Sequence, residues 1–301
     1  MNPAAPLPDF DSLWDYDRPD ATEAEFRRLL PAARVSGDRD RVAQLLTQVA
    51  RAQGLQMKFD EATRTLDEAE TTLQGEAGVA RVRLLLERGR VLNSSKRRDE
   101  SKALFREAWE LARRVTADAF AVDAAHMLGI VETGEVSVEW NQKALALAEA
   151  SDDPKARRWL GSLYNNLAWT RHDGGDPAAA LDLFQRALAA REAEGDAKKI
   201  HVARWSVARE LRSLGRLDEA LSIQRRLLTE GTPDGYVHEE IAECLLARGE
   251  EKEAAPHFAA AFQALSSDPW LQRDEPDRLE RMRLLSHTMG NRDTVSRESP
   301  A

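Results

Sequence analysis

Three segments in the second half of the chain repeat one spacing of small, turn-forming and bulky residues. A small residue is followed eight positions later by a charged turn residue, a glycine is followed five positions later by alanine, and a bulky residue comes four positions after that alanine. The members are Ala168, Gly175, Ala180 and Phe184; Ala208, Gly215, Ala220 and Gln224; and Ala242, Gly249, Ala254 and Phe258. Such a period constrains the fold strongly, because each unit must pack on its neighbours in the same way.

Helix-stop signals recur at short intervals along the chain, for example at Gly37, Gly134 and Gly174–Pro177. Between them, apolar residues follow three- and four-residue spacings. Ala, Leu, Glu and Arg dominate the composition and favour helices, whereas runs rich in Val, Ile and Thr are nearly absent. Thr22 and Glu25 have the spacing of a capping box, which predicts a first helix from residue 22. The sequence therefore predicts an all-α chain.

The three segments resemble the tetratricopeptide repeat, which pairs two antiparallel helices in each unit. In that family a small residue in each helix lets the two backbones approach closely, and a large side chain fills the space between them. The resemblance assigns these roles to the repeated alanines and to Phe184 and Phe258, with a glycine closing the first helix. It implies a right-handed α-solenoid of about six helix pairs with flanking helices.

Weaker copies lie upstream, around Ala62–Ala69, Gly89–Ala108 and Asp118–Ala148, and the last of these has Asn141 at the bulky position. Successive second-helix positions are 39, 36, 43, 40 and 34 residues apart, whereas the family period is about 34. The expected parts are a flexible acidic arm over 1–21, a flanking helix over 22–37, the solenoid over 38–268, a capping helix over 269–290 and a disordered tail over 291–301.

The N-terminal arm combines prolines and aspartates with the aromatic residues Phe10, Trp14 and Tyr16. Pro3, Pro6 and Pro8 forbid a helix at its start. Two interpretations remain open at this point: the aromatic residues pack on the first helix, or they form a docking motif.

The net charge and the composition of the chain limit the classes of partner that it can bind. The net charge of −9 disfavours nucleic acid, which needs a basic face. No uninterrupted apolar run approaches the roughly 20 residues of a membrane span, and the N-terminus lacks the features of a signal peptide. The one cysteine, Cys244, excludes an intrachain disulfide. A cytoplasmic protein without membrane or nucleic-acid partners is expected.

The resemblance places certain first-helix residues in the concave groove, where family members bind peptides. The candidate binding residues are Asn165, Asn166, Trp169, His172, Trp205, Arg209, Arg212, Arg90 and His126. Asparagine amides pair with peptide backbone, tryptophan offers rigid apolar area, and arginine grips carboxylates. Together these residues predict binding of a protein or peptide segment, possibly acidic. The alternative is structural: the tryptophans stack between repeats and the arginines make ordinary ion pairs.

Other functions have weaker support. The carboxylate clamp of some tetratricopeptide domains is mostly missing, since Val122, Val202 and Ser206 replace its polar positions. His238, Glu239, Glu243 and Cys244 lack the second histidine of a helical zinc motif. We therefore expect no catalytic residue, cofactor or metal, and a scaffold or adaptor function. The alternatives are a peptide-sensing regulator and a self-assembling protein, for example a homodimer.

Overall fold

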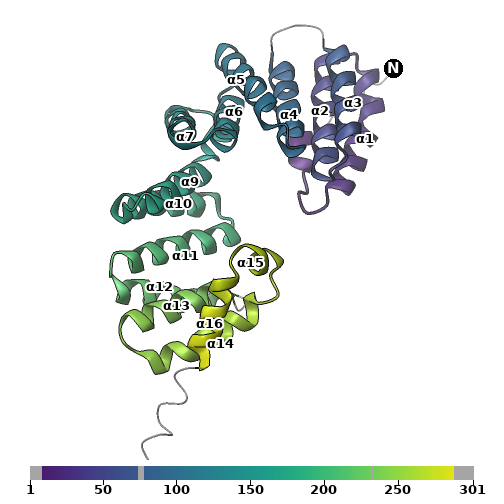
Figure 1. The fold of residues 1–301 in the computed structure, drawn as a ribbon. Coiled ribbons are helices and arrows are strands. Elements are labelled where there is room, and N and C mark those ends of the chain that lie inside the picture. The colour runs from purple at the N-terminus through teal and green to yellow at the C-terminus, as the bar shows by residue number, and fades with distance from the viewer. Residues whose placement is uncertain (1–8, 74–77, 232–233, 288–301) are drawn as a thin grey trace, which may run out of the picture. The chain divides into compact units, whose positions relative to one another are not determined.

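The computed structural model describes residues 9–73, 78–231 and 234–287 (Figure 1). Over these residues the regular structure is helical and no strand occurs, so the all-α prediction is confirmed. The chain divides into two compact units, the first ending at Leu163 and the second beginning at Tyr164. None of the helices in the described ranges has both the length and the apolarity that crossing a bilayer requires.

The first unit is made of helix pairs that pack in chain order. Its elements are η1 (Phe10–Leu13), α1 (Pro19–Val35), α2 (Arg39–Leu55), α3 (Phe59–Thr72), α4 (Val79–Ser94), α5 (Arg98–Arg114), α6 (Asp118–Val131), α7 (Gly134–Ala150) and α8 (Pro154–Arg157). The helix α2 packs on α3, α4 on α5 and α6 on α7, and α2 also contacts α4 (Figure 1). The helices α2, α4 and α6 are therefore the first helices of three repeats.

The second unit continues the same pattern. The boundary between the units falls within α9 (Leu160–Asp173), which is followed by α10 (Pro177–Glu194), α11 (Ala197–Ser213), α12 (Leu217–Glu230), α13 (Gly235–Ala247), α14 (Glu251–Leu265), α15 (Pro269–Asp274) and α16 (Pro276–His287). The helix α11 packs on α12, and α13 on α14. Trp169 of α9 contacts Phe184 of α10. The first helices of this unit are therefore α9, α11 and α13.

The small residues of the repeat lie where the helices meet. Ala168, Ala208 and Ala242 on the first helices and Ala180, Ala220 and Ala254 on the second helices are all fully buried. Phe184 and Phe258 are buried in the core of the second unit. Gly175, Gly215 and Gly249 have φ angles of 75°, 73° and 77°, a left-handed conformation that costs glycine little. The roles that the resemblance implied for these residues are confirmed.

Glycine replaces alanine at this contact in two repeats of the first unit. A Cβ atom on Gly89 would lie 2.5 Å from the ring of Phe105, and one on Gly129 would lie 2.6 Å from the amide of Asn141. Asn141 thus occupies the bulky position of its repeat, as the sequence predicted. Only glycine allows this approach without displacing the neighbouring side chain.

Gln224 takes the place that Phe184 and Phe258 occupy in the neighbouring repeats. Its side chain is fully buried, and neither its amide nitrogen nor its amide oxygen has a hydrogen-bond partner within the described ranges. A buried amide without partners is destabilising. The repeat therefore contains a polar residue at a position that otherwise holds an apolar plug.

The first helix begins earlier than the capping-box spacing predicted. The helix α1 starts at Pro19 with Arg18 at its N-cap, so residue 22 lies inside it. Thr22 instead bonds to Asp15: its hydroxyl donates to the Asp15 carbonyl at 3.0 Å, and the Asp15 amide donates to the hydroxyl at 3.2 Å. The part of the expected arm that the structure describes, residues 9–18, contains the helix η1 and packs against the repeats instead of extending freely.

At the C-terminus, two short helices take the place of the expected single capping helix. The helices α15 and α16 are separated at Pro276, because proline cannot continue a helix in that position. Leu279 and Met282 of α16 are buried in the core of the second unit. The end of the expected capping helix and the expected disordered tail lie outside the described residues.

Candidate functional site

The candidate binding residues of the second unit lie on two consecutive first helices. Asn165, Asn166, Trp169 and His172 are on α9, and Trp205, Arg209 and Arg212 are on α11. All of these side chains are half-buried, so each helps to support the fold and also presents part of its surface. The structure therefore brings this part of the predicted set together on one face.

A cation that contacts two neighbouring aromatic rings lies at the centre of this face. The guanidinium carbon of Arg209 lies 5.7 Å from the ring centroid of Trp169 and 5.6 Å from that of Trp205. The two indole rings are 6.3 Å apart and tilted by 39°. At these distances the cation is attracted to both ring faces. Arg209 thus holds the indole rings of two neighbouring repeats together.

The aromatic row continues onto the third first helix of the unit. Trp205 lies 6.3 Å from Tyr236 of α13, nearly edge-on at 77°, and its indole nitrogen donates to the Tyr236 carbonyl at 3.2 Å. Trp169, Trp205 and Tyr236 thus form a row of half-buried rings on α9, α11 and α13, which we call the aromatic row. Each ring combines apolar area with few rotatable bonds, which suits a binding surface.

A buried carboxylate from the next repeat neutralises the arginines. Glu240 of α13 is 1% exposed and accepts hydrogen bonds from Arg209 Nη1 at 2.8 Å and Arg212 Nε at 2.7 Å. Burial by itself would lower the pKa of Arg212, but the hydrogen bond and the charge of Glu240 outweigh it and raise this pKa. Both guanidinium groups are therefore already paired inside the chain, as in the structural alternative for these residues.

Glu210 on α11 is a second buried carboxylate of this face. It is 0% exposed, and its Oε2 lies 2.7 Å from Nδ1 of His172 on α9. Its other oxygen, Oε1, is buried without a hydrogen-bond partner among the residues that the structure describes. His172 therefore contacts a carboxylate of the next repeat, and its ring also lies edge-on to Trp169 at 5.3 Å.

Asn165 and Asn166 differ from their neighbours because their side-chain amides are uncommitted. Within the described ranges, no hydrogen bond involves either amide group, although both residues are only half-buried on α9. Each amide offers two N–H donors and one carbonyl acceptor. They are thus the polar groups of this face that remain available for an external backbone.

The remaining two candidates, Arg90 and His126, belong to the first unit and are held by internal contacts. Arg90 donates to Glu87 and to Asp123, both at 2.6 Å. Burial opposes ionisation of Arg90, but the charges of Asp123 and Glu87 outweigh burial and raise its pKa. Burial lowers the pKa of His126, whose ring lies 5.0 Å from that of Trp159. The side chains of both residues are therefore engaged in contacts within the first unit.

Comparison with known proteins agrees with this geometry. The sequence profile of the tetratricopeptide repeat matches residues 132–193. The structure aligns with the Signal Transduction ATPase with Numerous Domains (STAND) protein with a tetratricopeptide repeat sensor from Pyrococcus horikoshii, at a TM-score of 0.67 and 14% identity. It also aligns with a chain of the APC/C hetero-tetramer Cut9-Hcn1, at a TM-score of 0.57 and 18% identity. The chain contains tetratricopeptide repeats and has the fold of a tetratricopeptide-repeat solenoid.

These alignments cover 84% and 91% of this chain, but only 40% and 48% of the two solved chains. The chain thus spans less than half the length of either, and at these identities they share its fold. No curated protein matches the sequence significantly. Tetratricopeptide repeats generally form a non-catalytic, protein-interacting fold.

The residues of the incomplete zinc motif make other contacts in this repeat protein. Glu239 pairs with Arg278 at 2.6 Å and Glu243 pairs with Arg281, while His238 faces His257 with their Nδ1 atoms 2.9 Å apart. Burial raises the pKa of the Cys244 thiol to about 12, so the thiolate that binds metal is disfavoured. In the parts of the chain that the structure covers, no group of three or more metal-ligating side chains occurs.

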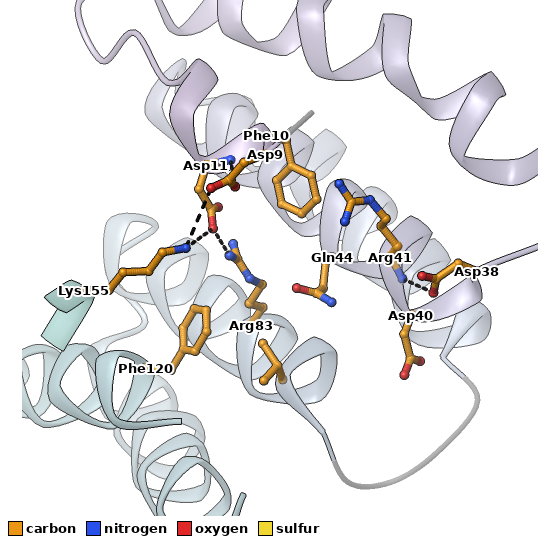
Figure 2. A pocket seen from close by; sticks show the side chains of 11 residues that line it. Asp9, Phe10, Asp11, Asp38, Asp40, Arg41, Gln44, Arg83, Phe120 and Lys155 are labelled. Carbon is orange, nitrogen blue, oxygen red and sulfur yellow. Dashed lines mark hydrogen bonds and ion pairs between the residues drawn. The ribbon is translucent and has the colours of Figure 1, made fainter. Parts of the chain in front are cut away.

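Reasoning from the sequence missed one further face of this repeat protein, on the first helices of the first unit. A cavity of about 770 Å³ there is bordered by Phe10 and Asp11 of the N-terminal segment and by Arg41, Arg83 and Phe120 of α2, α4 and α6 (Figure 2). The signal for this arrangement was the group of aromatic residues among the acids of residues 9–16. The surface on which these aromatic residues pack could not be found from the sequence, because its side chains come from three separate helices.

Proposed function

We propose that the chain is a non-catalytic scaffold that binds a protein or peptide segment on the first-helix face of its second unit. One observation carries this proposal: the aromatic row of Trp169, Trp205 and Tyr236 begins on α9, the helix that also carries two asparagine amides without a hydrogen-bond partner among the described residues. Half-buried aromatic rings with nearby polar groups are typical of recognition surfaces.

The proposed roles follow from the hydrogen-bonding groups and the exposed ring surface that remain available on each side chain. The amides of Asn165 and Asn166 would pair with the N–H and C=O groups of an extended or helical backbone. The exposed parts of Trp169 and Trp205 would contact apolar side chains of the bound segment. Their positions are held by Arg209, which contacts both rings, and by Phe184, whose ring centroid lies 5.0 Å from that of Trp169.

The charges of this face do not favour an acidic partner. Arg209 and Arg212 both pair with Glu240, and Glu210 adds a second buried carboxylate, so two positive charges face two negative charges. A partner carboxylate would have to compete with Glu240, which is already desolvated and hydrogen-bonded. We therefore propose that the segment is recognised by its backbone and apolar side chains.

A peptide selected from a display library against the intact protein provides the test. Its dissociation constant would be measured by fluorescence anisotropy for wild type and for Asn165→Ala/Asn166→Ala. We expect about a tenfold loss of affinity, roughly 1.4 kcal/mol, which corresponds to one or two lost hydrogen bonds. The melting temperature should not change, because these amides make no bond inside the described chain.

Trp270→Ala serves as the matched control, because Trp270 is an exposed aromatic residue on α15, which is not one of the three first helices that carry the aromatic row. It should bind the selected peptide like wild type. If Trp270→Ala loses binding and the asparagine double variant keeps it, the first-helix face is not the binding site. A peptide that both variants bind as wild type does would also contradict the proposal.

A further inference from the structure

The N-terminal segment, residues 9–16, occupies the first-helix face of the first unit in the way that a bound peptide would. Phe10 is 7% exposed and lies between two guanidinium groups, those of Arg41 and Arg83, each 5.5 Å from its ring centroid. Four residues along, the indole nitrogen of Trp14 donates to the Gln48 side chain at 2.9 Å. The segment is therefore held at two aromatic anchor points.

The receiving side chains form a regular stripe on α2. Arg41, Gln44, Gln48 and Arg51 are spaced by three, four and three residues, which places them on one face of the helix. Gln44 borders the cavity, and the Arg51 guanidinium lies 5.5 Å from the Trp14 ring and 5.6 Å from the Tyr16 ring. Trp14 and Tyr16 stack on each other with centroids 4.9 Å apart. A first helix thus presents two amides, with a cation on either side of them, to aromatic side chains.

The carboxylates of the segment complete the charges of this face. Asp11 forms an ion pair with Arg83 of α4, and Lys155 of α8 lies 3.8 Å from Asp11 and 3.9 Å from Asp9 (Figure 2). Arg83 is only 8% exposed and lies 4.8 Å from the centroid of the Phe120 ring. Within the described ranges, its carboxylate partner comes from the N-terminal segment alone. Without an acidic segment, Arg83 would be a desolvated cation without a counter-ion.

The segment leaves part of this face unfilled. The cavity of about 770 Å³ continues beside Phe10, between α2, α4 and α6 (Figure 2). Asp9, Ser12 and Tyr16 are exposed, and most of the polar contacts of the segment involve groups that water can also reach. Another segment of the same kind could therefore replace this one by exchanging two aromatic side chains, the buried Phe10 and the half-buried Trp14.

We propose that this face is a second recognition surface, whose partner is a segment of another protein with an aromatic residue between two carboxylates and a tryptophan four positions later. The chain's own Asp9-Phe10-Asp11 and Trp14 occupy the surface when this partner is absent. The own segment competes at the high effective concentration of an intramolecular ligand. This inference concerns the first unit and does not rest on the function proposed for the second.

The test uses the full chain and a fluorescein-labelled peptide with the sequence of residues 9–17. In the full-chain variant Phe10→Ala/Trp14→Ala, which removes both anchors, we expect the peptide to bind at least tenfold more tightly than it binds wild type. Adding Arg83→Glu should reduce this binding at least tenfold, and a peptide carrying Asp11→Arg should restore it. Asn165→Ala/Asn166→Ala should leave it unchanged.

Three results would overturn the proposal. The first is that Phe10→Ala/Trp14→Ala, the opened variant, binds the peptide with the same affinity as wild type while circular dichroism shows both proteins to be folded. The second is equal binding of a scrambled peptide of the same composition, which would indicate charge attraction alone. The third is binding that is insensitive to Arg83→Glu. If the opened variant does not fold, Asp11→Arg in the full chain gives the same comparison, because it changes only a partly exposed side chain.

Discussion

Arg83 in the first unit and Arg209 in the second each contact two aromatic rings, but their carboxylate partners come from different parts of the chain. Arg83 contacts Phe10 and Phe120 and pairs with Asp11 of the N-terminal segment. Arg209 contacts Trp169 and Trp205 and pairs with Glu240 of the next repeat. The same local chemistry thus holds neighbouring repeats together in one unit and holds a separate segment in the other.

The difference shows how a repeat face can be either structural or receptive. When the carboxylate belongs to the next repeat, the ion pair is part of the packing and the arginine has no charge to spare for a ligand. When the carboxylate belongs to a segment that only lies on the face, the arginine already forms the kind of contact that a ligand would make. The identity of the counter-ion therefore decides which arginines are available for binding.

The largest expected effect is the loss of the internal counter-ion in the second unit. Glu240→Gln should reduce the free energy of unfolding by roughly 3 kcal/mol or more, because it leaves two half-buried guanidinium groups without their carboxylate. Asp11→Asn should cost less, about 1–2 kcal/mol, because only one guanidinium group loses its carboxylate and Asp11 itself is partly exposed. Urea unfolding followed by circular dichroism measures both. Equal losses would mean that the two ion pairs have the same role.

A smaller effect is expected from the close approach in the first unit. Gly89→Ala places a Cβ atom 2.5 Å from the Phe105 ring, so that the ring or the helix must move. We expect a loss of about 1–3 kcal/mol, typical of overpacking in a core. Gly174→Ala is the control, since Gly174 is exposed in a turn and its Cβ would meet nothing closer than 3.3 Å. A harmless Gly89→Ala would show that Phe105 is loosely packed.

In the second unit, removing a polar plug should stabilise the protein. Gln224→Met keeps the length of the side chain and removes two buried polar atoms without partners among the described residues. We expect a gain of about 1–2 kcal/mol, seen as a higher melting temperature. The control is Gln185→Met, which replaces an exposed glutamine on a second helix and should give no gain in stability. Destabilisation by Gln224→Met would indicate that the amide has a partner such as bound water.

The smallest expected effect is a loss of stability in acid. Burial lowers the pKa of His126 in the first unit and of His238 and His257 in the second. Because the folded state binds the proton less readily than the unfolded state, stability is complete above the ordinary value of 6.5 and falls as the pH drops below it. Melting temperatures of wild type and His126→Gln between pH 8 and pH 5 measure this.

The histidine substitution should act on the first unit alone. We expect His126→Gln to lessen the acid dependence contributed by that unit, while the dependence contributed by His238 and His257 persists. A pH profile that His126→Gln leaves unchanged would show that this imidazole takes up its proton as easily in the folded state as in the unfolded one.

The candidate site was less predictable than the fold. The positions of Trp169, Trp205 and Arg209 on first helices followed from the repeat spacing, and the structure places these side chains on one face. Their contacts did not follow from it, because Glu240 is 31 residues from Arg209 and reaches it only through the stacking of two repeats. The role of these residues in binding a partner stays a prediction.

By itself, the sequence determined the helices, the turns between them and the helix pairs, since small residues, glycine caps and apolar spacing act over a few residues or within one pair. Ala168, Gly175 and Phe184 are examples. The tertiary structure alone decided which charges meet. Arg83 pairs with Asp11, 72 residues away, and whether an arginine is closed off or left for a ligand depends on how separate helices pack. Packing at that range is set by the sum of many side-chain contacts, and no local pattern encodes it.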